Sequence, residues 1–299
     1  KGSTSNTAIT IDGRQGQTGY LNTPPNHIII RDCVISDFAQ GGVAIIASDY
    51  ILCEDNLVYN CGRWSRWGAS GITNIYDRPL NDGQSNIFHR IIYRRNVITD
   101  ILQLVNSTFI NQNSITDGNC MQFDENGNLT YPYGYLAESN ILTYAGGSGV
   151  HTLSKPNVTF RNNTIWQNNR NKPARGELSC DTYTTSLNGI GIYNNVIVPR
   201  NSVGVTAYSY QNSTLTINHT SQGNIVYNPT NAGRALPGFT ALNVNPLFVN
   251  ATEIRANANF TPQSGSPLLT NGVLNQMPDV DILWKPKPTT PRVGAIYYA

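Results

Sequence analysis

The chain has 299 residues and a formal net charge of +2, and only 13% of its residues are charged. Abundant Asn, Gly, Ser, Thr and Tyr, with few Lys, Glu and Met, suit short strands joined by polar turns better than long helices. Recurrent apolar clusters exclude a disordered chain, and the lack of a Lys/Arg run excludes a nucleic-acid footprint. No apolar stretch approaches the roughly 18 residues that a membrane span needs.

One short sequence pattern recurs along most of the chain. Its copies are 28-IIIRDCVI-35, 51-ILCEDNLV-58, 91-IIYRRNVI-98, 135-YLAESNIL-142, 158-VTFRNNTI-165, 190-IGIYNNVI-197 and 219-HTSQGNIV-226. The sixth residue is Cys33 in the first copy and Asn in all the others, and the residue two positions later is always apolar. Alternating apolar residues place one face of a short strand inward. An Asn tolerates a sharp turn, and its amide can bond to the same Asn one repeat away, so the pattern predicts a stacked Asn ladder.

The spacing of the ladder positions distinguishes bare repeats from repeats that carry loops. Successive positions are 23, 40, 44, 23, 32 and 29 residues apart, and we interpret 23 residues as one bare turn of a solenoid. Over residues 8–228 the repeat resembles the right-handed parallel β-helix superfamily, which includes pectate lyases, polygalacturonases and phage tailspikes. The resemblance implies an all-β, single-stranded right-handed parallel β-helix with an Asn ladder and long loops on one side.

The end of the chain has a different pattern. The segments 243-NVNPLFVN-250, 259-NFTPQSGSPLLTNG-272 and 292-RVGAIYY-298 resemble the closing segment of secreted bacterial β-helix proteins. We therefore expect a β-helix over 1–235 and a closing segment of the same domain over 236–299 that covers the open end. No cap is visible before Ala8, so we expect a preceding part or another chain to cover the first repeat.

A second strand of each repeat carries the candidate catalytic residues. If Val43, Ile72, Met121 and Val150 point inward, their neighbours point outward and stack about 4.8 Å apart. This row contains Gln122, His151 and, with a one-residue shift, Glu177. We interpret His151 and Glu177 as a general base and acid, or as a base and its orienting carboxylate. The alternative is a polar ladder in which Glu177 is only an ion-pair partner.

Long loops beside this strand carry the candidate binding residues. Aromatic rings suit the apolar faces of sugars, and Arg suits uronate carboxylates or sulfates. The predicted substrate-binding residues are Arg63, Trp64, Arg66, Trp67, Tyr133 and Arg175. Packing of a loop onto the solenoid explains the two tryptophans equally well. The carboxylates of Asp117 and Asp124 suit a Ca²⁺ ion, although both residues are also common turn formers.

Cysteines and glycosylation motifs bear on where the protein works. The five cysteines form no C-x-x-C pair, so we expect buried free thiols with at most one disulfide. Eight N-x-S/T motifs are present, at Asn106, Asn128, Asn157, Asn162, Asn212, Asn218, Asn250 and Asn259. With the low charge, they favour a secreted, extracellular or cell-surface protein. The first residue is Lys rather than Met, which suggests a processed form or a fragment.

Two functions fit these observations. The first is an extracellular protein that binds and cleaves a polysaccharide by a lyase or glycoside hydrolase mechanism. Polygalacturonase motifs are only partly echoed, in 116-TDG-118, 123-FDE-125 and 149-GVH-151, and no R-I-K follows, so no residue role is carried over from that family. The second is a non-catalytic, glycosylated structural or adhesive protein, such as a fibre subunit or tailspike-like scaffold, that forms homo-oligomers or end-to-end assemblies.

Overall fold

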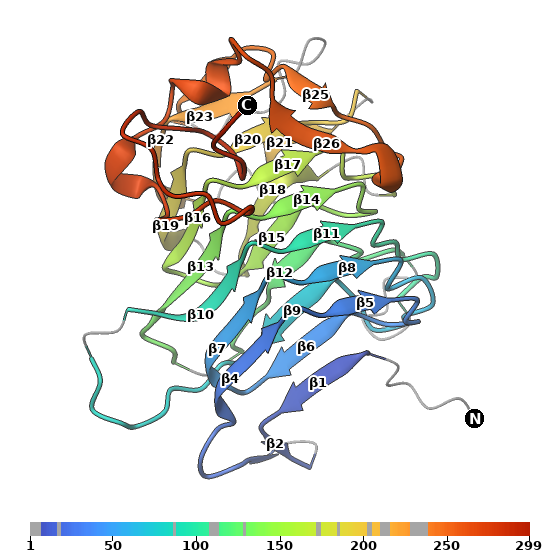
Figure 1. Cartoon of the computed structure of the whole chain (residues 1–299). Helices are drawn as coiled ribbons and strands as arrows, with labels where there is room; N and C mark the ends of the chain where they lie inside the picture. The colour runs from blue at the N-terminus through green and yellow to red at the C-terminus, as the bar shows by residue number, and fades with distance from the viewer. Residues whose placement is uncertain are drawn as a thin grey trace.

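The structure is a computed structural model of the whole chain. It describes residues 7–16, 19–85, 88–107, 114–127, 130–171, 175–183, 186–201, 205–209, 216–227 and 239–299. Within these residues, nearly all regular structure is β-strand, and the strands coil into a solenoid of three parallel sheets (Figure 1). The predicted parallel β-helix is confirmed, and its coil is right-handed, as crossovers between parallel strands are.

Each turn of the solenoid contributes one strand to each of three sheets, which we call sheets I, II and III in chain order. Sheet I contains β1 (Ile9–Asp12), β6 (Val43–Ile46), β9 (Ile72–Ile75), β12 (Met121–Phe123), β15 (Val150–Leu153), β18 (Gly176–Asp181) and β21 (Thr206–Ser209). Sheet II contains β4 (Asn26–Arg31), β7 (Asp49–Glu54), β10 (His89–Arg94), β13 (Gly134–Glu138), β16 (Val158–Arg161), β19 (Ser186–Tyr193) and β22 (Thr216–Gln222). Sheet III contains β5 (Val34–Ser36), β8 (Leu57–Tyr59), β11 (Val97–Thr99), β14 (Ile141–Thr143), β17 (Thr164–Trp166), β20 (Val196–Val198), β23 (Asn224–Val226) and β24 (Ala241–Asn243).

The remaining elements are short. Two antiparallel pairs are formed by β2 (Arg14–Gln15) with β3 (Gly19–Tyr20) and by β25 (Phe248–Asn250) with β26 (Asn259–Pro262). Three 3₁₀ turns follow in the C-terminal segment: η1 (Arg255–Asn257), η2 (Pro267–Leu269) and η3 (Leu274–Gln276). No helix of the described residues is long and apolar enough to cross a membrane.

The Asn ladder lies at the corner between sheets II and III. The side-chain oxygen of Asn140 accepts from the backbone N–H (2.9 Å) and from the side-chain amide (3.1 Å) of Asn96. Its own amide nitrogen donates to the carbonyl of Tyr93 at 2.9 Å. The same pattern links the ladder from Asn56 to Asn224, and the N–H of Cys33 donates to Asn56 at its first position. The predicted ladder is therefore confirmed, with every buried amide paired along the stack.

The sharp turn at this corner is made by the residue before each ladder position. These residues all have a positive φ: Asp32, Asp55, Arg95, Ser139, Asn162, Asn194 and Gly223. Asn, Asp and Gly tolerate the left-handed region, which explains most of them. The ladder Asn thus supplies the hydrogen bonds, while its predecessor bends the chain.

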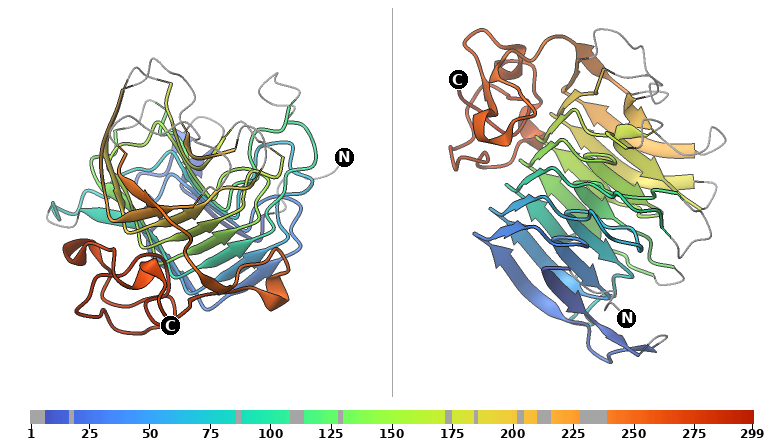
Figure 2. Two further views of the ribbon diagram at one scale, coloured as in Figure 1. Left: turned by 90° about the horizontal axis from the view of Figure 1, so that it is seen from above. Right: turned by 90° about the vertical axis from the view of Figure 1, so that its right-hand side faces the viewer.

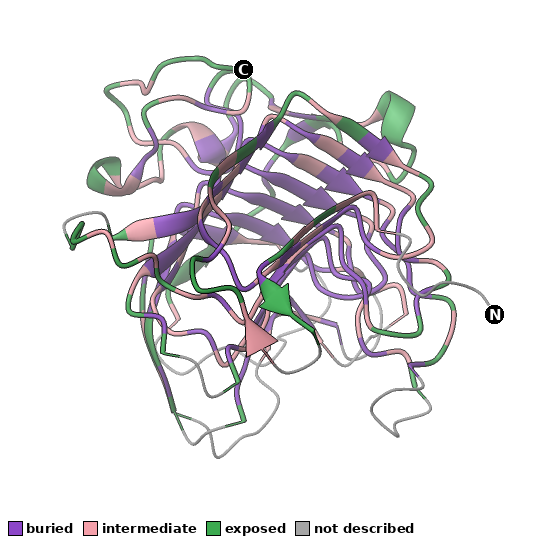
Figure 3. Ribbon diagram, turned by 90° about the horizontal axis from the view of Figure 1, so that it is seen from below, coloured by how far each residue is buried: buried purple, intermediate pink, exposed green. Residues whose placement is uncertain are grey.

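The hydrophobic core fills the inside of the solenoid. Inward residues of adjacent turns stack in rows, for example Ile51, Ile91 and Tyr135 in sheet II, and all three are fully buried. Viewed along the solenoid, the strands are largely buried and exposure concentrates in the loops (Figure 3). The five cysteines all lie in the described part of the chain and are free thiols, four of them buried in this core.

The C-terminal segment packs along the side of the solenoid. It covers the outer face of sheet III, where Ile141, Val196 and Ile225 form a second apolar cluster with Phe260 and Val293. The views from above and from the side show it beside the corner between sheets II and III (Figure 2). The described residues 239–299 therefore do not lie over the open end as expected, except that β24 pairs with β23 and extends sheet III. The apolar outer face of sheet III is the physical reason, because it must be covered.

Candidate functional site

The outer face of sheet I presents a row of polar side chains. The strand register aligns Thr73 with Gln122, Gln122 with His151, and His151 with Ser179. Their neighbours Met121 and Val150 are fully buried inside the solenoid, so the aligned residues point outward. The predicted juxtaposition of Gln122 and His151 therefore exists in the structure.

Glu177 does not belong to this row, and that part of the prediction is wrong. Ser179 pairs with His151, and Glu177 lies at the corner between sheets III and I, where it is fully buried. Its carboxylate accepts from the backbone N–H of Asn168 at 2.9 Å and from the side-chain amide of Asn168 at 2.7 Å. Burial raises the pKa of Glu177 to about 8. The prediction shifted the alignment by one residue in the wrong direction, because the register lies one residue later than an alignment of Gly176 with Gly149 gives, so that Ser179 and not Glu177 pairs with His151.

Asp181 is the partner of His151 that sequence reasoning missed. Nε2 of His151 lies 2.9 Å from Oδ2 of Asp181, and both side chains are almost completely buried. The hydroxyl of Ser179 donates to the same oxygen at 3.2 Å, and Ser209 donates to Ser179 at 3.0 Å. Asp181 follows Ser179 by two residues, so correct register would have placed it on the outer face by alternation alone. Its other oxygen, Oδ1, is buried and has no hydrogen-bond partner within the described residues.

The surroundings of His151 favour its neutral imidazole. Burial lowers its pKa, the guanidinium of Arg175 lowers it further, and Asp181 offsets only part of this effect. Although burial opposes it, the hydrogen bond from His151 holds the pKa of Asp181 below its ordinary value. The ionised carboxylate only accepts, so Nε2 carries the proton and Nδ1 carries the lone pair. Nη1 of Arg175 lies 3.5 Å from Nδ1, which is at the limit of a hydrogen bond.

Gln122 is held in a fixed position beside His151. Its side-chain oxygen accepts from the hydroxyl of Ser70 at 2.8 Å and from the amide of Asn119 at 3.0 Å. Asn119 in turn accepts from the backbone N–H of Ser148. The amide of Gln122 is therefore oriented by three successive turns of the solenoid.

Asp124 follows β12 on the same outer face. Its backbone N–H donates to the carbonyl of Asn74 at 2.8 Å, which continues the strand ladder and places the side chain in the outward row of Leu153 and Asp181. Burial raises the pKa of Asp124 to about 7, and the nearby carboxylates of Asp117 and Glu125 contribute to the rise. A carboxyl that titrates near neutral pH suits proton transfer.

The Ca²⁺ site predicted for Asp117 and Asp124 would need ligands besides these two carboxylates. Among the residues that the structure describes, no group of three or more His, Cys, Asp or Glu side chains is arranged to hold a metal ion. The amide of Asn119 also donates to Asp117, at 3.3 Å. Calcium binding stays a prediction that only an experiment can test.

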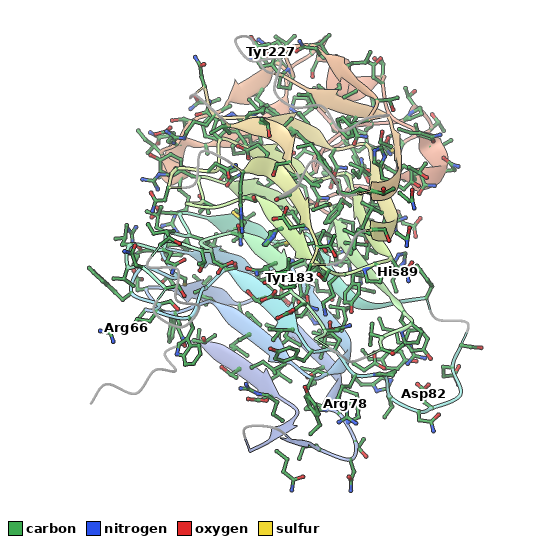
Figure 4. All side chains as sticks on the ribbon, turned by 180° about the vertical axis from the view of Figure 1, so that it is seen from behind. Arg66, Arg78, Asp82, His89, Tyr183 and Tyr227 are labelled. Atoms are coloured by element: carbon green, nitrogen blue, oxygen red, sulfur yellow. The ribbon has the colours of Figure 1, made fainter. Side chains whose placement is uncertain are left out.

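Loops border the outer face of sheet I on both sides. Arg66 lies at one margin and Arg78 and Asp82 at the other, with Tyr183 between them (Figure 4). Trp64 and Trp67 are exposed by 64% and 44%, on the same loop as Arg66.

Two of the predicted binding residues are engaged in local structure. The guanidinium of Arg63 pairs with Asp100 at 2.9 Å, which attaches the loop to the next turn. The ring of Tyr133 stacks on Arg90, whose guanidinium lies 3.3 Å from the ring centroid and is ion-paired with Asp49. Another predicted binding residue, Arg175, contacts the imidazole of His151.

The predicted glycosylation sites differ in accessibility. Asn162 is fully buried, and its side chain donates to the carbonyls of Arg292 and Gly294, so the prediction for this residue is wrong. A carbohydrate chain there would displace the C-terminal segment. Asn157 is half-buried, while Asn128 and Asn212 lie outside the described residues. The exposed sites are Asn106, Asn218, Asn250 and Asn259.

The similarity of this chain to known proteins is weak. No family model matches the chain, and no curated protein matches it. Among solved structures, it is similar to the A-module of mannuronan C-5 epimerase AlgE4 from Azotobacter vinelandii, with 14% identity and a TM-score of 0.31. The match covers 65% of this chain and 57% of that one, which is less than two thirds of its length. The parallel sheets and the Asn ladder define this chain as a right-handed parallel β-helix protein.

Proposed function

We propose that the protein is a carbohydrate-active enzyme that cleaves an acidic polysaccharide at the outer face of sheet I. The observation that carries this proposal is the pairing of His151 with Asp181 on an outward strand position, beside Arg175. A β-helix repeats one such row on successive turns, which matches the repeat of an extended polymer, and in this structure Gln122, His151 and Ser179 of the row are buried. A buried imidazole is not needed to build the outer face of a β-helix. The presence of His151 there therefore favours a chemical role for this residue.

The arrangement supports a β-elimination of the lyase type. Arg175 makes only a long contact with Nδ1 of His151, so a sugar carboxylate can draw the guanidinium away and free the lone pair. The neutral imidazole then takes the proton from the carbon next to that carboxylate. The electron pair of the C–H bond forms the new C=C bond, and the C–O bond to the leaving sugar breaks. Asp124, protonated in part near pH 7, donates the proton that the leaving oxygen takes.

The test is cleavage of a panel of uronate-containing and neutral polysaccharides, each with added Ca²⁺ and with a chelator. A lyase produces a conjugated unsaturated uronate that absorbs in the ultraviolet, whereas a hydrolase produces reducing ends without this absorbance. We expect H151A to lose at least about 100-fold in rate, since general base catalysis contributes about 10²–10⁴-fold. H27A is the matched control, because His27 is exposed on β4 and stacks on Tyr50 away from sheet I.

Two results would count against the proposal. One is an H151A variant that remains folded and cleaves a confirmed substrate at the wild-type rate. The other is an absence of cleavage on every polymer in the panel. A loss of activity only with the chelator would support the predicted Ca²⁺ requirement near Asp117 and Asp124.

A structural or adhesive role is the second candidate, and one observation favours it. The outer row of sheet III is apolar, and beyond the C-terminal segment it leaves Val34 70% exposed, next to half-buried Leu57 and Val97. Exposed apolar rows of this kind often bind another protein surface. Sedimentation that shows assembly, together with no cleavage by the wild type, would favour this role.

A secreted or cell-surface location stays part of the proposal. Exposed glycosylation motifs at Asn218, Asn250 and Asn259 are compatible with it. Peptide mass spectrometry of the protein from its natural source tests it, and unmodified Asn at all three positions would remove this support.

A further inference from the structure

A cavity of about 540 Å³ adjoins the outer face of sheet I. It lies at the margin between sheets I and II, where the chain leaves β12, β15 and β18. The residues of its wall that matter here are Glu125, Tyr131, Ser154, Thr182, Tyr183 and Asn188. Its position follows from connectivity, because Thr182 and Tyr183 come directly after Asp181, and Ser154 comes directly after Leu153. The cavity therefore begins where the row of Asp124, Leu153 and Asp181 ends.

Tyr183 stands at this cavity as a fixed aromatic wall. Its backbone N–H donates to the hydroxyl of Ser154 at 3.0 Å, and that hydroxyl lies 3.2 Å from the hydroxyl of Thr182. Its side chain is nevertheless 70% exposed. A ring that is held by its backbone but uncovered loses little conformational entropy when a ligand packs against it.

The cavity is negatively charged. Glu125 lines it, and Asp124 and Asp117 lie close by. Partial loss of solvent around the Tyr183 hydroxyl raises its pKa despite the exposure of the ring, the charges of Glu125, Asp124 and Asp117 raise it further, and the charge of Arg175 lowers it.

No Lys or Arg side chain lines the cavity among the described residues. The nearest cation behind the wall is Lys155, which is fully buried and donates to Asp77 and to the lining residue Asn126. Its charge offsets part of the charge of Glu125 and Asp124, but its ammonium group does not face the cavity as a lining group. The charge therefore changes sign across the face, from Arg175 beside His151 to Glu125 in the cavity.

We propose that this cavity is a subsite for a sugar ring without a carboxylate, whose hydroxyl groups donate to Glu125 and whose apolar face packs on Tyr183. A carboxylate accepts hydrogen bonds from hydroxyl groups but repels another carboxylate. This inference rests on the proposed function and narrows its substrate class. The polymer alternates a uronate, which Arg175 and His151 receive, with a non-acidic sugar, which the cavity receives.

The experiment compares two kinds of polymer and a pair of matched variants. Tetrasaccharides of an alternating uronate–N-acetylhexosamine polymer and of a polyuronate are titrated into the protein by calorimetry, and the two polymers are also tested for cleavage. E125Q removes the negative charge in the cavity. E253Q makes the same change on an exposed residue of the C-terminal segment, which pairs with Arg200. Y183A is a second cavity variant whose exposed side chain can be removed without disturbing the core.

We expect the alternating tetrasaccharide to bind at least about 10-fold more tightly than the polyuronate. E125Q and Y183A should each weaken its binding by at least about 5-fold, while E253Q leaves it unchanged. E125Q should also bring the two ligands closer in affinity, because the repulsion of the uronate is lost.

Equal or tighter binding of the polyuronate would overturn the inference, as would unchanged affinities in both cavity variants. Other outcomes distinguish a failure of the proposed function from a failure of the subsite. If no polymer is cleaved but binding still depends on Glu125, the subsite stands and the enzymatic proposal does not. If an alternating polymer is cleaved with the same preference by wild type and E125Q, the enzyme stands and the subsite does not.

Discussion

At the scale of single residues, burial shifts the pKa values of two side chains on the outer face of sheet I in opposite directions, and both shifts favour proton transfer. It lowers the pKa of His151, which stays a neutral base, and raises the pKa of Asp124 to about 7, which keeps part of that carboxyl protonated. Separation of this kind is how a single site holds a base and an acid at one pH. The sequence predicted His151 from its place on a strand. It did not predict Asp181 or the pKa of Asp124, because both depend on register and on loop residues that cover them.

The raised pKa of Asp124 makes stability depend on pH. The folded protein holds this proton more tightly than the unfolded chain does, in which the carboxyl has its ordinary pKa of 3.8. The contribution to stability is fully present below about pH 4 and is lost as the pH rises through about 7. D124N removes the charge, so we expect it to match the wild type at pH 3.5 and to be more stable at pH 8.

Allowing for solvent screening of a half-buried group, the gain at pH 8 should be about 1–2 kcal/mol, or a few degrees in melting temperature. Thermal unfolding followed by circular dichroism across pH 3.5–8.5 measures it. D32N is the control, because Asp32 is exposed at a turn with φ of 55° that Asn also adopts. A D124N curve parallel to that of the wild type at all pH values would contradict the role assigned to Asp124.

At the scale of elements, the Asn corner is stronger evidence for the fold than the strands are. Short strands such as β11 and β14 have too few residues to be recognised alone, but Asn96 and Asn140 mark where each begins. The corner between sheets III and I has no such uniform marker. Its loops differ in length from turn to turn, and the register of β18 on β15 differs by one residue from the alignment of their glycines. The alignment therefore succeeded for sheets II and III and failed at Glu177 in sheet I.

We expect a substitution inside the Asn ladder to cost much more stability than a substitution at its first position. N140A would remove the acceptor of the backbone N–H of Asn96 and of one amide hydrogen of Asn96, whose other hydrogen bond goes to Cys53, and the donor to the carbonyl of Tyr93. Each unpaired group costs about 1–3 kcal/mol, so we expect a loss of about 3–5 kcal/mol in the free energy of unfolding. C33A changes the first position, where the side chain receives no ladder bond, and should cost less than about 1 kcal/mol. Denaturant unfolding measures both, and equal losses would show that the amide stack does not stabilise the corner.

At the scale of the whole molecule, two apolar clusters are stabilised by different parts of the chain. The cluster inside the solenoid depends on contacts between adjacent turns, and its alternating pattern was readable from the sequence. The cluster outside sheet III depends on residues roughly one hundred or more positions apart, such as Val293 near β17 and β20. A contact of this kind leaves no periodic pattern in the sequence. The closing segment could therefore be predicted, but its expected position was over the open end.

This division predicts that the C-terminal segment can be released while the solenoid remains folded. Val293 is fully buried between the segment and sheet III, and V293D places a charge there without touching the inner core. We expect backbone amides of β25 and β26 to lose hydrogen-exchange protection by at least about 100-fold, while those of β10 and β13 keep theirs. V249D is the matched control, since Val249 is 50% exposed on the same segment and should change neither region. Protection lost equally from β10, β13 and β26 in V293D would show instead that the segment and the solenoid unfold as one unit.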